Sequence, residues 1–261
     1  MKTFVLNGWS ASEQAWDLCA FPRDRVFSYV DQLEGLPEKA VEAEDEVVLV
    51  GWSMGGSAAL RLAVSYPEKV KGLVLVAATA RMMKDDGWAG MSERRLAALE
   101  LGLKMTHGEG FFGIPDGKPN PYMLDEERNL ARGLEYLRET DLRAALEELK
   151  ASGRLKCPVA IFQSERDGIV RAENAAYLKS IFPQASVTMV PGSEHALPII
   201  IPEMIDAAVS DVLKENIKSE VWVLTQSRVT AAQAGLAIRS EPSRAKRVPR
   251  DAKCAEKMDV V

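Results

Sequence analysis

A serine between two glycines is the first feature of the sequence that suggests chemistry. Ser53 stands at the centre of a G-x-S-x-G pattern, Gly51–Gly55. The apolar run Glu46–Val50 precedes the pattern and the helical pattern Met54–Tyr66 follows it. A strand, a tight turn and a helix in this order form a nucleophile elbow, in which glycines leave room for neighbouring backbone. The alternative is an ordinary turn with an idle serine. We predict that Ser53 is a nucleophile of acyl transfer.

Two further groups must activate such a serine: a base that takes its proton and a carboxylate that orients the base. The chain contains two histidines. His195 follows the last predicted strand, where parallel strands gather ligands at their carboxyl ends. His107 lies among helical patterns, where a solvated position at a helix end is the alternative. Asp167 and Glu165 both follow the fifth predicted strand, and we favour Asp167 because Gly168 and then a helix follow it. The order Ser, Asp, His is that of α/β-hydrolases.

The tetrahedral intermediate of acyl transfer also needs two backbone N–H donors. Met54, directly after the nucleophile, is one candidate. Trp9, in the loop Asn7–Ser10 after the first predicted strand, is the other. The alternative for Trp9 is a core residue packed in a plain turn. We expect Trp9 and Met54 to form the oxyanion hole, and Trp9 to contact the substrate as well.

The elements that must position these residues alternate along the chain. Short apolar runs predict six buried parallel strands, at Lys2–Asn7, Val26–Val30, Glu46–Val50, Gly72–Ala77, Cys157–Gln163 and Ala185–Val190. Amphipathic patterns predict helices between and after them, at Ser12–Cys19, Gln32–Ala43, Met54–Tyr66, Ala172–Ile181 and Pro202–Glu215. This alternation predicts an α/β fold with a compact, mostly parallel sheet of about six strands.

The alternation breaks between the fourth and fifth predicted strands, over Thr79–Gly153. Three helical patterns fill this segment, at Ser92–Met105, Leu124–Arg138 and Asp141–Ala151, with the Gly/Pro-rich piece Gly108–Pro121 between the first two. An insertion of this length is expected to form a helical lid over the site. Its aromatic residues Trp88, Phe111 and Phe112 are candidates for substrate binding, with simple packing as the alternative.

Charge divides the 261 residues into two parts. Residues 218–261 hold nine Lys or Arg against five Asp or Glu, whereas residues 1–217 are acidic. The basic part has no aromatic interleaving of the kind that nucleic-acid binding would favour. We therefore expect a hydrolase domain over 1–217, with the lid at about 79–153, and a basic, poorly ordered extension over 218–261.

Composition argues against several classes of protein. The three cysteines, Cys19, Cys157 and Cys254, are far apart and form no C-x-x-C pair, so neither a disulfide framework nor a metal site is indicated. The sequence contains no leader pattern, and no apolar run reaches the roughly 18 residues of a membrane helix. We expect a cytoplasmic monomer that binds neither nucleic acid nor membrane.

With these residues in hand, the sequence resembles the α/β-hydrolase superfamily and, within it, the pimeloyl-[acyl-carrier protein] methyl ester esterases of biotin synthesis. The resemblance covers residues 1 to about 217. It rests on Gly8-Trp9, Gly51–Gly56, Asp86–Gly90, Gly133–Leu137, Thr140–Arg143 and Asp167–Val170, and on the spacing from Asp167 to His195. The elbow and triad are typical of the whole superfamily, whereas the lid pieces are more specific.

The resemblance implies that Ser53, Asp167 and His195 form a catalytic triad and that Trp9 and Met54 form the oxyanion hole. It implies hydrolysis, through an acyl-enzyme, of the methyl ester of a pimeloyl chain carried on acyl carrier protein, with no cofactor. This chain departs from the family in several respects, among them a short segment from Trp9 to Ser53 and a shortened lid. The family usually has histidine where Asn7 stands, and the two N-terminal antiparallel strands common in the superfamily are missing.

An acidic carrier protein would bind a basic surface. Arg128 and Arg132 lie four residues apart on one predicted helical face, and Arg138 and Arg143 lie just beyond. The alternative is that these arginines pair with neighbouring acids on a solvated surface. Two other functions stay open: another small serine hydrolase, such as a short-chain carboxylesterase or a carbon–carbon bond hydrolase, and a catalytically silent receptor or scaffold.

Overall fold

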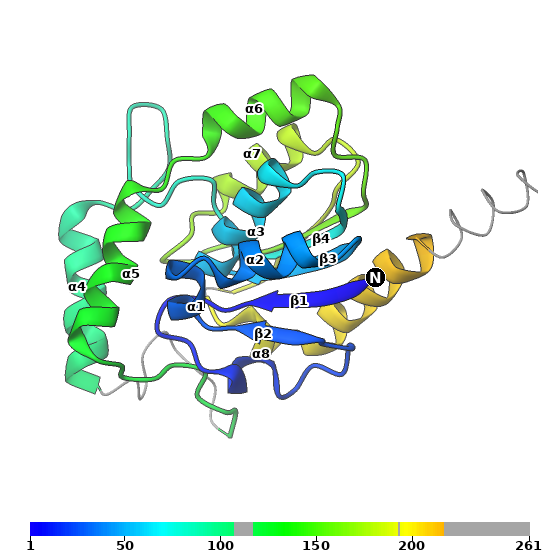
Figure 1. The fold of residues 1–261 in the computed structure, drawn as a ribbon. Coiled ribbons are helices and arrows are strands. Elements are labelled where there is room, and N and C mark those ends of the chain that lie inside the picture. The colour runs from blue at the N-terminus through cyan, green and yellow to red at the C-terminus, as the bar shows by residue number, and fades with distance from the viewer. Residues whose placement is uncertain (107–116, 193, 217–261) are drawn as a thin grey trace, which may run out of the picture. The chain divides into compact units, whose positions relative to one another are not determined.

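Six strands form one parallel sheet in the computed structural model, which describes residues 1–106, 117–192 and 194–216. The strand order is β2-β1-β3-β4-β5-β6 (Figure 1). The strands are β1 (Lys2–Leu6), β2 (Arg25–Phe27), β3 (Val47–Trp52), β4 (Val70–Val76), β5 (Val159–Ser164) and β6 (Ser186–Val190). The predicted sheet is confirmed, with each predicted strand found within a few residues of its expected place.

Helices connect the strands and cover the sheet. They are η1, a 3-10 helix (Glu13–Trp16), and the α-helices α1 (Tyr29–Leu33), α2 (Leu36–Ala43), α3 (Met54–Ser65), α4 (Glu93–Thr106), α5 (Glu127–Glu139), α6 (Arg143–Ser152), α7 (Glu173–Ile181) and α8 (Leu197–Ile200). A further helix spans residues 202–216.

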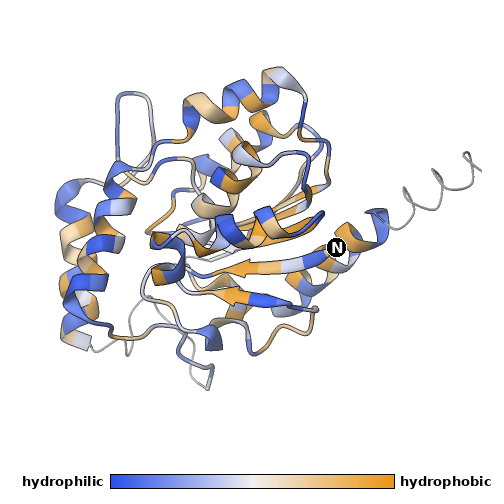
Figure 2. Cartoon of the chain, in the orientation of Figure 1, coloured by the Kyte–Doolittle hydropathy of each residue, from blue (hydrophilic) through white to orange (hydrophobic). Residues whose placement is uncertain are grey.

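The two faces of the sheet carry separate apolar cores. Alternate residues along β3 belong to different cores, as period-two strand geometry requires: Val48 and Val50 pack on one side, Val47 and Leu49 on the other. The first core includes α8 and the helix over 202–216, and the second includes α2, α3 and α7. The strands are accordingly among the most hydrophobic segments in Figure 2.

Three predicted elements differ from the structure. The helix predicted over Ser12–Cys19 is only the four-residue η1. The helix predicted over Gln32–Ala43 is two helices, α1 and α2, divided by Gly35 at a φ of 69°. The strand predicted to reach Val30 ends earlier, because Ser28 and Asp31 form a capping box that starts α1.

The insertion between β4 and β5 contains α4, α5 and α6, which lie close to the predicted lid helices. Ion pairs join the start of α4 to the end of α5, through Glu93 and Arg138, and the end of α4 to the start of α5, through Lys104 and Glu127. These helices are therefore antiparallel neighbours (Figure 1). Within the described residues the domain is continuous to the helix over 202–216, whereas the predicted extension lies outside them.

Candidate active site

Ser53 lies at the turn between β3 and α3, with a φ of 57° and 7% of its surface exposed. A Cβ at Gly51 would lie 2.4 Å from the carbonyl oxygen of Gly55. A Cβ at Gly55 would lie 2.0 Å from the carbonyl oxygen of Leu6. No side chain fits at either distance, so the turn requires both glycines. The left-handed serine, which costs roughly 1–3 kcal/mol, is held in place by this packing.

Three predicted residues meet in a continuous chain of hydrogen bonds. Ser53 Oγ lies 2.8 Å from His195 Nε2, and His195 Nδ1 lies 2.7 Å from Asp167 Oδ2. The other carboxylate oxygen of Asp167 accepts from the backbone N–H groups of Ile169 (2.7 Å) and Val170 (3.1 Å). All three side chains are buried. A carboxylate fixed by backbone in this way holds the imidazole with its free nitrogen toward the serine.

The sequence left two alternatives at this site. Glu165 is exposed, whereas Asp167 reaches His195, so the geometry favours Asp167. His107 lies outside the described residues. One supporting residue was missed: Gln163 Nε2 lies 3.3 Å from the Asp167 carboxylate and donates to the Val170 carbonyl at 2.9 Å. Its signal was a polar residue in an otherwise apolar strand.

The predicted oxyanion donors lie on either side of the serine. Strand order reverses direction between β1 and β3, so the loops that follow these strands flank one crevice. A Cβ at Gly8 would lie 3.3 Å from Ser53 Cβ, which brings the Gly8-Trp9 loop directly against the predicted nucleophile. Among the described residues, neither the Trp9 nor the Met54 backbone N–H has a hydrogen-bond acceptor. Both can therefore serve a substrate oxygen.

Asn7, where the resembled family usually has histidine, anchors the loop after β1. Its backbone N–H donates to the Phe27 carbonyl at 3.0 Å, and its own carbonyl accepts from Gln32 Nε2 at 2.8 Å. Its side-chain oxygen accepts from the indole N–H of Trp16. Because Asn7 is fully buried, these bonds tie the start of the loop to β2, α1 and η1.

A mostly apolar cavity opens on the serine and the histidine. Beside Ser53 and His195 it is lined by Gly8, Trp9, Trp52, Met82, Leu96, Leu99, Tyr122, Leu137 and Ile169. Burial, with some help from the negative charge of Asp167, raises the pKa of the Tyr122 hydroxyl well above its usual range and keeps it neutral. Such a cavity suits the hydrocarbon part of an ester.

Of the four aromatic residues predicted to bind substrate, only Trp9 is found among the described residues that line this cavity. Trp9 lines it, and its indole N–H also donates to the Leu130 carbonyl at 3.1 Å, so it both packs and contacts the cavity. Trp88 lies elsewhere, edge-on to Tyr177 with ring centroids 4.9 Å apart. Phe111 and Phe112 lie outside the described residues. The missed cavity residues of α4, Leu96 and Leu99, show the i, i+3 spacing of one helical face.

The four arginines considered for a carrier protein fall into two pairs. Arg138 pairs with Glu93 at 2.9 Å, and Arg143 pairs with Asp85 at 2.8 Å and with Asp141 at 2.7 Å. Arg128 is exposed and Arg132 is partly buried, and neither forms an ion pair within the described part of the chain. The alternative, pairing with neighbouring acids on a solvated surface, therefore holds for two of the four arginines, Arg138 and Arg143.

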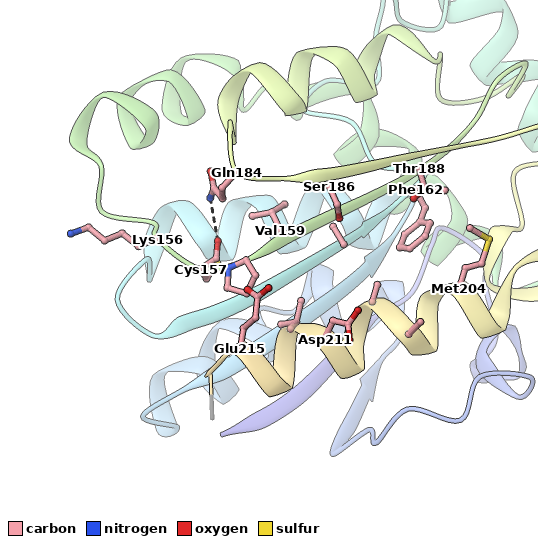
Figure 3. A pocket seen from close by; sticks show the side chains of 15 residues that line it. Lys156, Cys157, Val159, Phe162, Gln184, Ser186, Thr188, Met204, Asp211 and Glu215 are labelled. Carbon is pink, nitrogen blue, oxygen red and sulfur yellow. Dashed lines mark hydrogen bonds between the residues drawn. The ribbon is translucent and has the colours of Figure 1, made fainter. Parts of the chain in front are cut away.

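A larger pocket, of about 620 Å³, lies away from Ser53 and His195, between β5, β6 and the helix over 202–216 (Figure 3). Phe162, Thr188 and Met204 line one part of it, and Gln184 donates to the Cys157 carbonyl at 3.1 Å in another. None of its lining residues belongs to the predicted site, so its size alone does not mark it as the active site.

Neither a metal centre nor a disulfide is found in the described parts of the chain. No group of three or more His, Cys, Asp or Glu side chains there is arranged to hold a metal ion. Cys19 and Cys157 are buried thiols whose pKa burial raises to about 12. They are therefore protonated and poor nucleophiles at neutral pH.

The elbow, the buried Ser–His–Asp chain and the sheet define an α/β hydrolase. The family model described as alpha/beta hydrolase fold matches residues 43–200, and the chain belongs to this family. The predicted fold class is thereby confirmed.

Curated relatives of this chain are esterases. A pimeloyl-[acyl-carrier protein] methyl ester esterase of Yersinia enterocolitica is 25% identical over 247 residues, which cover 81% of this chain and 93% of the relative. Its Salmonella paratyphi A namesake is 24% identical, covering 74% of this chain and 86% of the relative. These relatives support the predicted resemblance and the predicted enzyme class, a hydrolase of the carboxylesterase type.

Solved structures agree in fold. An esterase from Exiguobacterium antarcticum superposes with a TM-score of 0.61 at 19% identity, covering 81% of this chain and 92% of the esterase. A hydrolase from Pseudomonas aeruginosa superposes with a TM-score of 0.60 at 20% identity, covering 81% of this chain and 89% of the hydrolase. Over the described ranges, no helix combines the length and the apolar character that spanning a bilayer requires.

Proposed function

We propose that this chain is a serine esterase that hydrolyses the methyl ester of a pimeloyl chain carried on acyl carrier protein. The observation that carries the chemistry is the hydrogen-bonded chain from Ser53 through His195 to Asp167 at the mouth of an apolar cavity. The substrate is suggested by the names of the relatives, which align with most of this chain.

Catalysis begins when Ser53 Oγ attacks the ester carbonyl and His195 Nε2 takes the hydroxyl proton. Asp167 holds the other ring nitrogen and stabilises the resulting imidazolium. The backbone N–H groups of Trp9 and Met54 donate to the oxyanion of the tetrahedral intermediate, an interaction in which each donor contributes about 3–4 kcal/mol to barrier lowering.

The intermediate collapses when His195 gives its proton to the leaving methoxy oxygen, which departs as methanol. Water, deprotonated by the same histidine, then attacks the acyl-enzyme and releases the free carboxylate. The apolar lining from Met82, Leu96 and Leu137 holds the methylene chain of the acyl group. No step requires a metal or a cofactor.

The direct test of the substrate is growth without biotin. A bacterial strain lacking its own pimeloyl ester esterase should grow when it expresses this chain and should fail to grow with Ser53→Ala at equal protein level. Purified protein should also release methanol from pimeloyl-[acyl-carrier protein] methyl ester. If the soluble protein hydrolyses short p-nitrophenyl esters but neither restores growth nor releases methanol from this substrate, its substrate is another short ester.

A further inference from the structure

Another pocket, of about 360 Å³, lies beside the apolar cavity and carries the opposite chemical character. Its lining includes three cationic side chains, those of Lys84, Arg95 and Arg171, together with Ser92 and Gly168. None of the described residues that line it is acidic. Ile169 lines both this basic pocket and the apolar cavity, so the two are adjacent.

Two acids close in sequence to these cations are engaged elsewhere. Asp85, next to Lys84, pairs with Arg143 at 2.8 Å, and Glu93 pairs with Arg138 at 2.9 Å. Within residues 1–106, 117–192 and 194–216, the side chains of Lys84, Arg95 and Arg171 form neither an ion pair nor a hydrogen bond. Three like charges around one pocket repel one another unless an anion lies among them.

Helix α4 connects the basic pocket to the reactive centre. Leu96 and Leu99 point into the apolar cavity, and Arg95, on the adjoining face, lines the basic pocket. The guanidinium of Arg95 packs over Gly168, where a Cβ would lie 3.0 Å from Nη2. Gly168 directly follows Asp167 of the triad. A chain whose carbonyl is at Ser53 and whose methylenes fill the cavity can therefore end among these cations.

We propose that Lys84, Arg95 and Arg171 form a subsite for an anionic group, a carboxylate or a phosphate, at the end of the ester substrate remote from the scissile bond. The inference deepens the proposed function and rests on it. The anion has two sources: the free carboxylate of a small dicarboxylic half-ester, or the phosphate through which a carrier protein bears its acyl chain.

The first arm of the test compares two small esters of the same chain length, monomethyl pimelate and the neutral methyl heptanoate. Arg95→Gln and Arg171→Gln should each lower kcat/KM for monomethyl pimelate about fivefold, mostly through KM, because each removes one solvent-exposed charge pair. Hydrolysis of methyl heptanoate should change less than about twofold. Lys39→Gln, an exposed cation on α2 that lines neither pocket, should leave both esters unchanged.

The second arm uses pimeloyl-[acyl-carrier protein] methyl ester and separates the two sources. A loss confined to this substrate identifies the phosphate, and a loss confined to monomethyl pimelate identifies the carboxylate. If the arginine variants lower all three esters equally, or none, the subsite is wrong.

A binding measurement separates this inference from the proposed function. In the Ser53→Ala background, calorimetry should show tighter binding of the pimelate dianion with Arg95 present than with Arg95→Gln. Equal affinities and unchanged ester ratios would overturn the subsite while leaving the esterase intact. Failure of the wild-type chain to hydrolyse any of the esters would instead overturn the proposed function, and pimelate binding would then decide the subsite alone.

Discussion

The triad and the lid hold their polar groups in different ways. Ser53, Asp167 and His195 are at most 7% exposed and are linked to one another and to backbone N–H groups. The ion pairs of the lid lie at its surface, with side-chain exposures of 22–83%. Buried, backbone-anchored bonds fix geometry, whereas exposed pairs contribute roughly 0–1 kcal/mol each. The sheet therefore holds these three side chains more firmly than the surface ion pairs hold the insertion.

The two regions meet at the loop after β1. The indole of Trp9 donates to Leu130 of the lid, and Ser10 exchanges hydrogen bonds with Met123 through both its side chain and its backbone. The same loop carries the predicted oxyanion donor. Lid and chemistry are thus coupled at one place, and changes there should affect both.

The largest effect is expected at the nucleophile. Ser53→Ala removes the attacking oxygen and should lower kcat for a p-nitrophenyl ester by at least about 10⁴-fold, with an unchanged circular dichroism spectrum. Ser65→Ala, at the exposed end of the same helix, should have full activity. Retained activity in Ser53→Ala would contradict the proposed mechanism.

The next effect distinguishes the two carboxylates that the sequence offered. Asp167→Asn loses the charge that orients His195 and stabilises its cation, so kcat should fall about 10³- to 10⁴-fold. Glu165→Gln, at an exposed position, should be within about twofold of wild type. The reverse ranking in steady-state kinetics would transfer the role to Glu165.

The sequence predicts the sheet and the residues at its edge better than it predicts the contacts of the insertion. The strands, the elbow and the chain order of the triad were predictable because period-two apolar runs and glycines at fixed positions follow from backbone geometry. The lining of the lid cavity was not, because Leu96, Leu137 and Tyr122 come from separate elements and meet only through packing. The pairing of Arg143 with Asp85 likewise depends on contacts that no periodicity encodes.

A change within the lid should reach the chemistry through Trp9. A Cβ at Gly133 on α5 would lie 2.4 Å from Trp9 Cδ1, so Gly133→Ala must displace the indole and with it the oxyanion loop. We expect kcat to fall about 10- to 100-fold, a fraction of the loss from removing one donor. Glu135→Ala, exposed on the same helix, is the control. Unchanged kcat in folded Gly133→Ala would show that lid and chemistry are independent.

A change in the cavity lining should affect selectivity and spare the triad. Leu96→Phe on α4 enlarges a side chain that lines the cavity, so kcat/KM for a hexanoyl p-nitrophenyl ester should fall about tenfold, in line with the roughly 1–3 kcal/mol cost of overpacking. The acetyl ester should change less than about threefold. Leu101→Phe, on the exposed face of the same helix, should affect neither. Equal losses on both esters would place Leu96 outside the acyl pocket.

The smallest effect is expected for the surface ion pairs of the lid. The hydrogen bond from Arg143 lowers the pKa of Asp141 from 3.8 to about 2. A carboxyl group whose pKa is lower in the folded state stabilises the fold at every pH above its unfolded-state pKa. This contribution is lost as the pH falls from near 3.8 toward 2. Because the two side chains keep 29% and 30% of their surface exposed to solvent, Asp141→Asn should cost less than about 1 kcal/mol at neutral pH. In urea unfolding this difference should shrink as pH approaches about 3, whereas Glu148→Gln on α6 should show none at either pH. A cost of several kcal/mol would mean that the lid is held as rigidly as the triad, and the contrast between the two regions would fail.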